Sequence, residues 1–183
     1  MQNLIKKRRV IAPGETPRYV YYWEDYPVQK INNMWLDTGG RSERIYVVQT
    51  NEKIVQRCML MCSDPGDLVL DITCGSGTTA VVAEQFGRRW ITCDTSRVSV
   101  VIAKQRIMSE LYDYYELAHP HEGVDSGFKY KTVPHVTLRS VANNDVASDE
   151  TLYDQPITDS KKARITGPFT VEAVPAPVVQ AIS

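Results

Sequence analysis

The chain has 183 residues, of which 43% are hydrophobic, and a formal net charge of −1 at pH 7. This length fits one globular domain, or one domain with a tail. The balanced charge excludes a global basic field, so any contact with DNA requires a local basic patch. No apolar stretch is long enough to span a bilayer, and the basic Met1–Val10 stretch is not followed by the apolar region of a secretory signal.

The N-terminal stretch is basic and then aromatic. The run Lys6–Arg9 could contact phosphates, although a solvated terminus is the commoner role of such a run. Tyr19 and Tyr21 alternate as in a strand. Aromatic side chains beside Arg18 could stack on bases, but packing in a core or an interface is their commoner use.

Residues 51–62 are predicted to form an amphipathic helix. Its apolar side chains recur at helical spacing, which indicates one face packed on a core. We therefore expect the two cysteines of this face to be buried. The residues of the face are Ile54, Val55, Cys58, Met59 and Cys62.

The stretch from Leu68 to Asp94 predicts a β-α-β unit with a glycine loop. Short apolar runs at Leu68–Asp71 and Trp90–Cys93 predict two buried strands. Between them, Thr78–Phe86 predicts a helix that Gly87 ends. The whole chain is organised around this unit.

The glycine loop and the end of the second strand form a candidate nucleotide site. Gly75 and Gly77 open the helix, where free backbone N–H groups can face a ligand. Asp94 follows Gly75 by 19 residues, close to the roughly 20 expected of a nucleotide-binding β-α-β unit. Its carboxylate can accept hydrogen bonds from both hydroxyls of a ribose. The alternative is an ordinary β-α-β unit with a glycine-rich turn.

Residues 96–117 are predicted to form the longest helix. Thr95 or Ser96 can cap it, and His119-Pro120 ends it. We expect its apolar stripe to face the core. That stripe comprises Val98, Val101, Ile102, Gln105, Met108, Leu111 and Tyr115.

The remaining residues read as a loop-rich tail. Gly127–Val141 has strand character, interrupted by Pro134. Asn143–Lys162 is polar and acidic, which predicts a mobile loop. Ala163–Val174 is expected to return to a strand, and Val174–Ser183 to be extended.

The cysteine pattern argues against a metal site. There is no Cys-x-x-Cys pair, and the three histidines lie far from the cysteines in the sequence. We therefore predict no bound zinc and four reduced thiols, typical of a cytoplasmic protein. The cysteines are Cys58, Cys62, Cys74 and Cys93.

Several strings resemble the cofactor half of amino-group DNA methyltransferases, which make N6-methyladenine or N4-methylcytosine. The most specific is Cys74–Thr79, similar to the family's Asp-Pro-Phe-Cys-Gly-Ser-Gly-Thr motif, with Ile72-Thr73 here in place of Pro-Phe. Others resemble larger adenine-specific, type III-like members. The flanking and tail strings are Trp35–Asp37, Glu43–Tyr46, Gln49, Pro65–Asp71, Gly87–Ile91, Arg97–Ile107, Gly127–Tyr130, Val133–Leu138 and Thr166–Glu172.

The resemblance implies an α/β fold, the Rossmann-like three-layer sandwich of S-adenosylmethionine-dependent methyltransferases, here incomplete. It implies S-adenosyl-L-methionine as cofactor, with the glycine loop around it and Asp94 on its ribose. The implied cofactor-binding residues are Gln49, Asp71, Thr73, Cys74, Gly75, Ser76, Gly77, Thr78, Thr79, Asp94 and Thr95.

The resemblance also divides the chain into three parts. Residues 1–30 would be an N-terminal segment and a remnant of the target-recognition region. Residues 31–118 would be the cofactor-binding domain, and residues 119–183 an extended tail with short strands.

The family's catalytic tetrapeptide, Asp/Asn/Ser-Pro-Pro-aromatic, is absent, because the sequence contains no Pro-Pro. In the order that this chain resembles, the tetrapeptide lies upstream, so the chain would begin after it and carry no catalytic residue. The implied function is the cofactor-binding portion of a site-specific DNA amino-methyltransferase of a restriction–modification system, acting on adenine N6 in preference to cytosine N4. Its implied partners are DNA, bound weakly, and a complementing half or a second copy.

Two other readings stay open. Gly75-Ser-Gly77-Thr-Thr-Ala80 satisfies the G-x-G-x-x-G/A pattern of an NAD-type dinucleotide-binding domain, with Asp94 on the ribose. A degenerate, non-catalytic interaction module with the same fold is the third reading.

Overall fold

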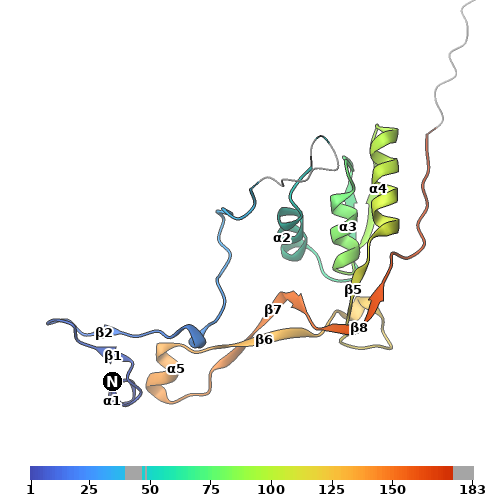
Figure 1. Ribbon diagram of the computed structural model, residues 1–183. Coiled ribbons are helices and arrows are strands. Elements are labelled where there is room, and N and C mark those ends of the chain that lie inside the picture. The colour runs from blue at the N-terminus through green and yellow to red at the C-terminus, as the bar shows by residue number, and fades with distance from the viewer. Residues whose placement is uncertain (40–46, 48, 175–183) are drawn as a thin grey trace, which may run out of the picture.

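The computed structural model describes residues 1–39, 47 and 49–174. Helices α2, α3 and α4 gather around one pair of strands, and a long β6–β7 ribbon leads from them to the N-terminal segment (Figure 1). The elements are α1 (Gln2–Lys6), β1 (Val10–Ile11), β2 (Arg18–Tyr19), the 3₁₀ turn η1 (Trp23–Asp25), α2 (Glu52–Cys62), β3 (Leu68–Asp71), α3 (Thr78–Gln85), β4 (Arg89–Thr92), α4 (Arg97–Ser109), β5 (Tyr112–Tyr115), the 3₁₀ turn η2 (Val124–Ser126), β6 (Tyr130–His135), α5 (Leu138–Asn143), β7 (Ser148–Pro156) and β8 (Thr158–Arg164).

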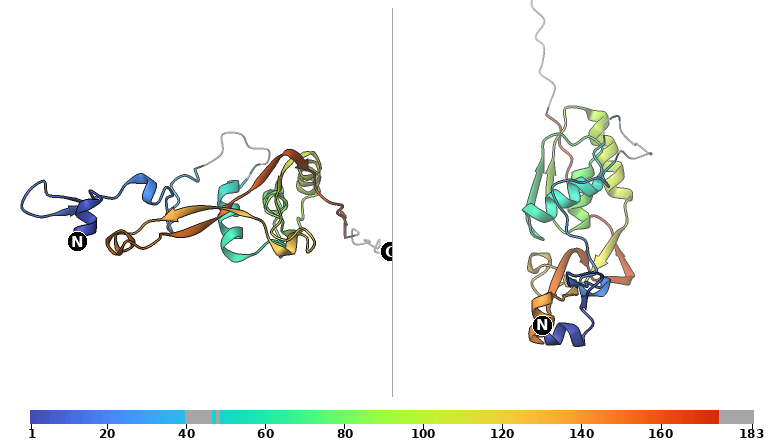
Figure 2. Two further views of the ribbon diagram at one scale, coloured as in Figure 1. Left: turned by 90° about the horizontal axis from the view of Figure 1, so that it is seen from below. Right: turned by 90° about the vertical axis from the view of Figure 1, so that its left-hand side faces the viewer.

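Strands β3 and β4 form the predicted β-α-β unit, paired in parallel. Their inward side chains Val69 and Trp90 pack against a core built by α2 and α3, and the helices stand on one side of the strands (Figure 2). The other face is open: Leu68 is 54% exposed, Leu70 62% and Ile91 50%. The strand–helix–strand order is confirmed, but the expectation of fully buried strands is wrong, because in the described part of the chain helices cover one face alone.

Glycine sets both ends of α3. Gly77 is its N-cap with φ 76°, and Gly87, with φ 71°, follows the C-cap Phe86 as predicted. A Cβ at position 77 would lie 2.8 Å from the Cβ of Ala103 in α4. The missing side chain therefore allows α4 to approach the glycine loop closely.

Helix α2 begins where predicted, with the Asn51 side chain accepting a hydrogen bond from the Lys53 N–H at its N-terminus. Met59 is buried in the core. Cys58 and Cys62 are exposed free thiols. The expectation that both are buried is wrong, because they lie beside the face that α2 turns to α3.

Helix α4 is shorter than predicted. The Ser96 side chain caps it by accepting from the Ser99 N–H, and it ends at Ser109 because Glu110 is extended, with φ −74° and ψ 141°. The aromatic stretch that follows is β5, which pairs antiparallel with β8. A partner from the far end of the chain thus converts the expected last turns of the helix into a strand.

The apolar stripe predicted for α4 lies mostly on its exposed side. Val98 is 65% exposed, Val101 62% and Met108 59%. The buried residues are instead Ser99, Ala103, Arg106 and Ile107. Apolar residues recur on both sides of this helix, so spacing alone does not select the face. The close contact with Gly77 selects it.

The acidic stretch 143–162 is not a loop, since it contains β7 and most of β8. Strand β7 pairs antiparallel with β6, and the Tyr130 and Tyr153 rings meet at 5.2 Å across the pair. Of the predicted strand at 127–141, only β6 forms, because Thr137 caps a short helix, α5. Of the predicted strand at 163–174, only its first two residues lie in β8; positions 175–183 lie outside the described residues.

The N-terminal segment packs on the far end of the β6–β7 ribbon (Figure 1). The Asn3 side chain donates a hydrogen bond of 2.8 Å to the Ala142 carbonyl, and Lys7 donates one of 2.9 Å to Asn144. The predicted strand around Tyr19 is only the two-residue β2. Among the helices described, none is long and apolar enough to cross a membrane.

Candidate functional site

The glycine loop lies at the carboxyl ends of β3 and β4. Asp71 is the last residue of β3, and its Oδ1 accepts hydrogen bonds from the Thr73 N–H (2.9 Å) and hydroxyl (3.3 Å). The Cys74 N–H donates to the Cys93 carbonyl at 2.8 Å, and the Gly77 N–H donates to the Cys74 carbonyl at 2.9 Å. The loop is thereby held against the end of β4.

Asp94 joins the loop to α4. Its carboxylate accepts from the Gly75 N–H at 2.9 Å and from the Ser96 N–H at 2.8 Å, and the Ser99 hydroxyl lies 2.7 Å from it. The hydrogen bonds from Ser96, Ser99 and Gly75 hold the pKa of Asp94 below its usual value. Asp94 is therefore ionised at neutral pH. Most of its roughly four acceptor positions are already used within the protein.

A buried arginine supports the loop from behind. Arg106 of α4 lies 3.3 Å from the Ser76 carbonyl and 3.2 Å from the Thr78 hydroxyl, and it forms an ion pair with Glu52 of α2. One side chain thus connects α2, α4 and the start of α3. Sequence reasoning missed both Arg106 and Ser99. The signal was present, because Ser99, Ala103 and Arg106 follow one another at helical spacing on one face.

Two hollows open beside the loop and meet at Cys74. The smaller has a volume of about 360 Å³ and lies along Asp71 and the start of α3. The larger, of about 730 Å³, lies between α4 and the stretch 169–174, with Asp94 in its wall. Burial raises the pKa of the Cys74 thiol between them. Both volumes fall within the range of small-molecule sites.

Most of the cofactor-binding residues predicted from the sequence line the two hollows. Of the eleven predicted cofactor-binding residues, all except Gly77 line one or the other. Gly77 faces α4 instead. Thr95 and Asp94 lie in the larger hollow, and Gln49 lies in the smaller.

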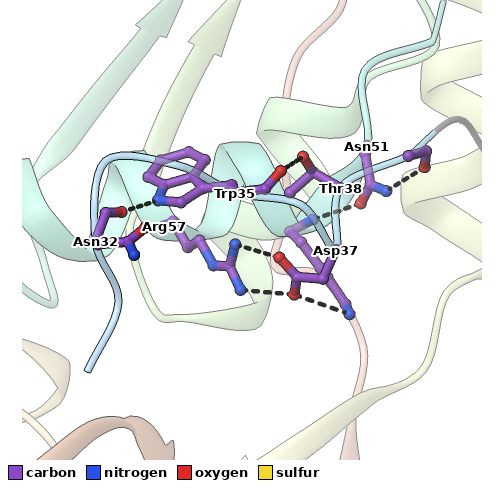
Figure 3. Close-up of polar contacts among 8 residues, drawn as sticks. Asn32, Trp35, Asp37, Thr38, Asn51 and Arg57 are labelled. Carbon is purple, nitrogen blue, oxygen red and sulfur yellow. Dashed lines mark hydrogen bonds and ion pairs between the residues drawn. The ribbon is translucent and has the colours of Figure 1, made fainter. Parts of the chain in front are cut away.

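Trp35 and Asp37, upstream of α2, contact Arg57 of that helix (Figure 3). Asp37 accepts two hydrogen bonds of 2.8 Å from Arg57, which lower the pKa of Asp37 to about 2. The Arg57 guanidinium also lies 5.3 Å from the centre of the Trp35 ring. These contacts hold Trp35 and Asp37 against α2. Glu43–Tyr46, which also carried the resemblance, lie outside the described residues.

A sequence model of the N6_N4_Mtase family, described as DNA methylase, matches residues 6–105, more than half of the chain. The chain belongs to this DNA methylase family. The prediction of an amino-group DNA methyltransferase relative is confirmed, as is that of an incomplete α/β methyltransferase fold. Neither the base methylated nor the type III-like assignment is resolved by this match.

Several type II methyltransferases are similar to this chain. Type II methyltransferase M2.DpnII of Streptococcus pneumoniae is 32% identical over 88 residues, which cover 45% of this chain and 32% of that protein. Type II methyltransferase M1.MboII of Moraxella bovis is 51% identical over 57 residues, covering 31% of this chain and 22% of that one. The chain thus spans about a third or less of the length of these relatives.

One solved structure that is similar is the crystal structure of an M1.HpyAVI–SAM complex. It shares 23% sequence identity, with a TM-score of 0.36, over 43% of this chain and 41% of that chain.

Proposed function

We propose that this chain is the S-adenosylmethionine-binding part of a site-specific DNA amino-methyltransferase, with adenine N6 as its target in preference to cytosine N4. The observation that carries the proposal is the pair of hollows that meet at the glycine loop of a chain in this family. The relatives named above support S-adenosylmethionine as the cofactor. The tail strings that resemble adenine-specific members support the choice of adenine.

The residues present fit such a cofactor. Its methionine end carries an ammonium and a carboxylate. The Asp71 carboxylate would attract the ammonium, and the first N–H groups of α3, which no side chain caps, would receive the carboxylate. The nucleoside end would lie in the larger hollow, with Asp94 accepting from a ribose hydroxyl through the acceptor capacity that its internal hydrogen bonds leave.

When bound, S-adenosylmethionine supplies a methyl group activated by its positive sulfur. The role of this chain is to orient that donor. Arg106 holds the loop at the Ser76 carbonyl, and the Asp94 carboxylate holds it at the Gly75 N–H. A donor kept in one orientation lowers the entropic part of the barrier for transfer to a nearby acceptor.

Calorimetry with the purified chain tests the proposal. S-adenosylmethionine should bind and NAD should not. Asp71→Ala and Asp94→Ala should each weaken binding by about tenfold or more, the effect expected of losing a charged hydrogen-bond acceptor. Asp113→Ala is the matched control, since Asp113 is an exposed carboxylate of β5 outside both hollows. Binding of NAD alone would favour a dinucleotide-binding domain, and binding of neither ligand would favour an interaction module.

The family's motif for the acceptor side of the reaction is not in this sequence. An exocyclic amine is a weak nucleophile, and the family's Pro-Pro-aromatic tetrapeptide, which accepts its hydrogen bonds and stacks on the flipped base, is missing. We therefore propose that the chain alone does not methylate DNA. A polypeptide carrying that tetrapeptide would complete the site.

The open face of the β3–β4 sheet supports a complementing partner. Its exposed side chains are Leu68, Leu70 and Ile91, with Arg89 at its margin, and β3 and β4 pair only with each other among the described strands. Exposed strand edges and apolar faces favour association.

Transfer of labelled methyl groups to mixed-sequence DNA tests the inactivity. We expect no turnover by the chain, and turnover after addition of the complementing polypeptide. Turnover by the chain alone, abolished by Asp71→Ala, would show that an acceptor site exists within it.

A further inference from the structure

A group of aromatic side chains at the end of the molecule remote from the glycine loop is displayed to solvent. Trp23 is 71% exposed, Tyr21 66%, Tyr19 51% and Tyr22 44%. Large apolar rings gathered on a surface mark a binding site more often than chance exposure does. We call these four residues and Tyr26 the aromatic surface. Packing in a core, the commoner use of such residues, does not account for them.

The aromatic surface is held by a rigid scaffold. Asp25, 6% exposed, accepts both guanidinium hydrogen bonds of Arg9 and a further one from the Tyr22 N–H at 2.8 Å. The Asp25 carbonyl accepts from the Val136 N–H at 2.8 Å, which ties the segment to the end of β6. The rings are therefore displayed from a fixed turn and lose little freedom on binding.

The aromatic surface encloses a hollow of about 520 Å³. Tyr21, Tyr22, Trp23 and Tyr26 line it, together with His135 from β6. The Tyr26 and His135 rings are stacked, with centroids 4.5 Å apart. Flat rings around an open hollow of this size suit a flat aromatic guest that inserts between them.

The charge of the segment that carries the rings indicates the class of guest. Residues 1–30 contain six Lys and Arg against three Asp and Glu, a net charge of +3, whereas residues 31–183 contain fifteen against nineteen, a net charge of −4. Asp25 is already paired with Arg9. Glu150 of β7 also lies beside the hollow, where the Tyr26 hydroxyl donates a hydrogen bond to it and its Oε2 lies 3.6 Å from the His135 Nδ1. The exposed basic side chains are Lys6, Lys7, Arg8, Arg18 and Lys30. Protein interfaces are depleted in lysine at their centres, whereas aromatic rings beside basic side chains are typical of sites for unpaired nucleotides.

We propose that the aromatic surface binds an unstacked stretch of a DNA strand, with bases stacked on Trp23 and Tyr21 and phosphates on the surrounding lysines and arginines. The choice of DNA as the nucleic acid rests on the proposed function. The site itself rests on the rings, the hollow and the local charge. It lies on a different part of the molecule from the two hollows at the glycine loop.

The test is fluorescence anisotropy of a labelled, mixed-sequence, single-stranded 12-nucleotide DNA with the full chain. Trp23→Ala should weaken binding about 5- to 140-fold, which corresponds to the loss of one base stack. Trp23→Phe should keep most of the affinity, because a ring remains. Tyr153→Ala is the matched control, since Tyr153 is 64% exposed on β7 away from the aromatic surface. Its affinity should be unchanged.

Salt gives a second, independent readout. If about three to five phosphates are neutralised, affinity should fall about 20- to 130-fold between 50 and 200 mM NaCl. Arg18→Gln should reduce this salt dependence and leave the effect of Trp23→Ala in place.

Several results would overturn the inference. One is no binding of the oligonucleotide at 50 mM NaCl, and another is equal affinity for the wild-type chain and Trp23→Ala. A third is a dimer in sedimentation that Trp23→Ala converts to monomers with DNA affinity unchanged, which would make the aromatic surface a contact between copies. Binding of S-adenosylmethionine, measured on the same variants, should not change. If the wild-type chain did not bind S-adenosylmethionine, the proposed function would be refuted and this inference would stand.

Discussion

Replacing Gly77 by alanine should destabilise the chain through two separable effects. The first is backbone strain, because Gly77 has φ 76° and a left-handed residue with a Cβ costs about 1–2 kcal/mol. The second is a clash, because the new Cβ would lie 2.8 Å from the Ala103 Cβ and 3.2 Å from the Ala103 Cα. Overpacking of this kind costs about 1–3 kcal/mol. The sum, about 2–5 kcal/mol, is a large part of a typical stability of about 5–15 kcal/mol.

Urea unfolding followed by circular dichroism measures this loss, and thermal unfolding should show a midpoint lowered by about 4–20 °C. Gly14→Ala is the control, since a Cβ there meets nothing within 4 Å. It should change stability by no more than about 0.5 kcal/mol.

A double-mutant cycle separates the two effects. Ala103→Gly alone should cost about 1 kcal/mol as a glycine in a helix. Combined with Gly77→Ala, it removes the 2.8 Å contact with the Ala103 Cβ and leaves the strain and the 3.2 Å approach to the Cα. The double variant should therefore be more stable than the sum of the two changes predicts, by about 1–3 kcal/mol. Additive effects, or a Gly77→Ala chain as stable as the wild type, would refute the argument that close approach of α4 dictates glycine here.

Three further predictions concern other parts of the chain. Tyr112→Phe should be neutral or stabilising by about 1 kcal/mol in urea unfolding at pH 7, because the buried Tyr112 hydroxyl has no hydrogen-bond partner among the described residues. Burial raises the pKa of Tyr112 to about 12, so the wild-type chain should lose stability between pH 10 and 12 and the Phe variant should lose less. Hydrogen bonds from Arg9 lower the pKa of Asp25 below 3.8, so this pair should stabilise the fold above about pH 4 and lose its effect as pH falls further, a loss that Asp25→Asn should flatten. Elemental analysis of the purified chain should find no stoichiometric zinc, since no tetrahedral set of ligands is encoded by the cysteine spacing.

Local patterns were sufficient for the β-α-β unit and for the nomination of its site. The boundaries of β3, α3 and the start of α4 follow from signals within a few residues of each: an apolar run, a glycine with positive φ, a capping serine. Asp94 was nominated by its distance from Gly75, and the two are joined by a hydrogen bond. Neighbouring residues decide such features, so they can be read from the sequence.

Predictions failed where a distant partner decides the structure. Residues 112–115 read as the end of a helix and are a strand because β8 pairs with them. The acidic stretch 143–162 is predicted to be a loop. It forms strands because β7 pairs with β6 and β8 pairs with β5. A strand has little stability without a partner, so the pairing partner determines whether it forms.

The sequence by itself determined the family resemblance, the glycine loop and ten of the residues that line the two hollows. Only the tertiary structure decided which face of α4 is buried, that Arg106 supports the loop, and that the aromatic surface is exposed. A periodic pattern indicates which residues share a face of a helix, but not which other element that face packs against. The contact between α4 and Gly77, and the docking of the N-terminal segment on β6, supply that information through pairs far apart in the chain.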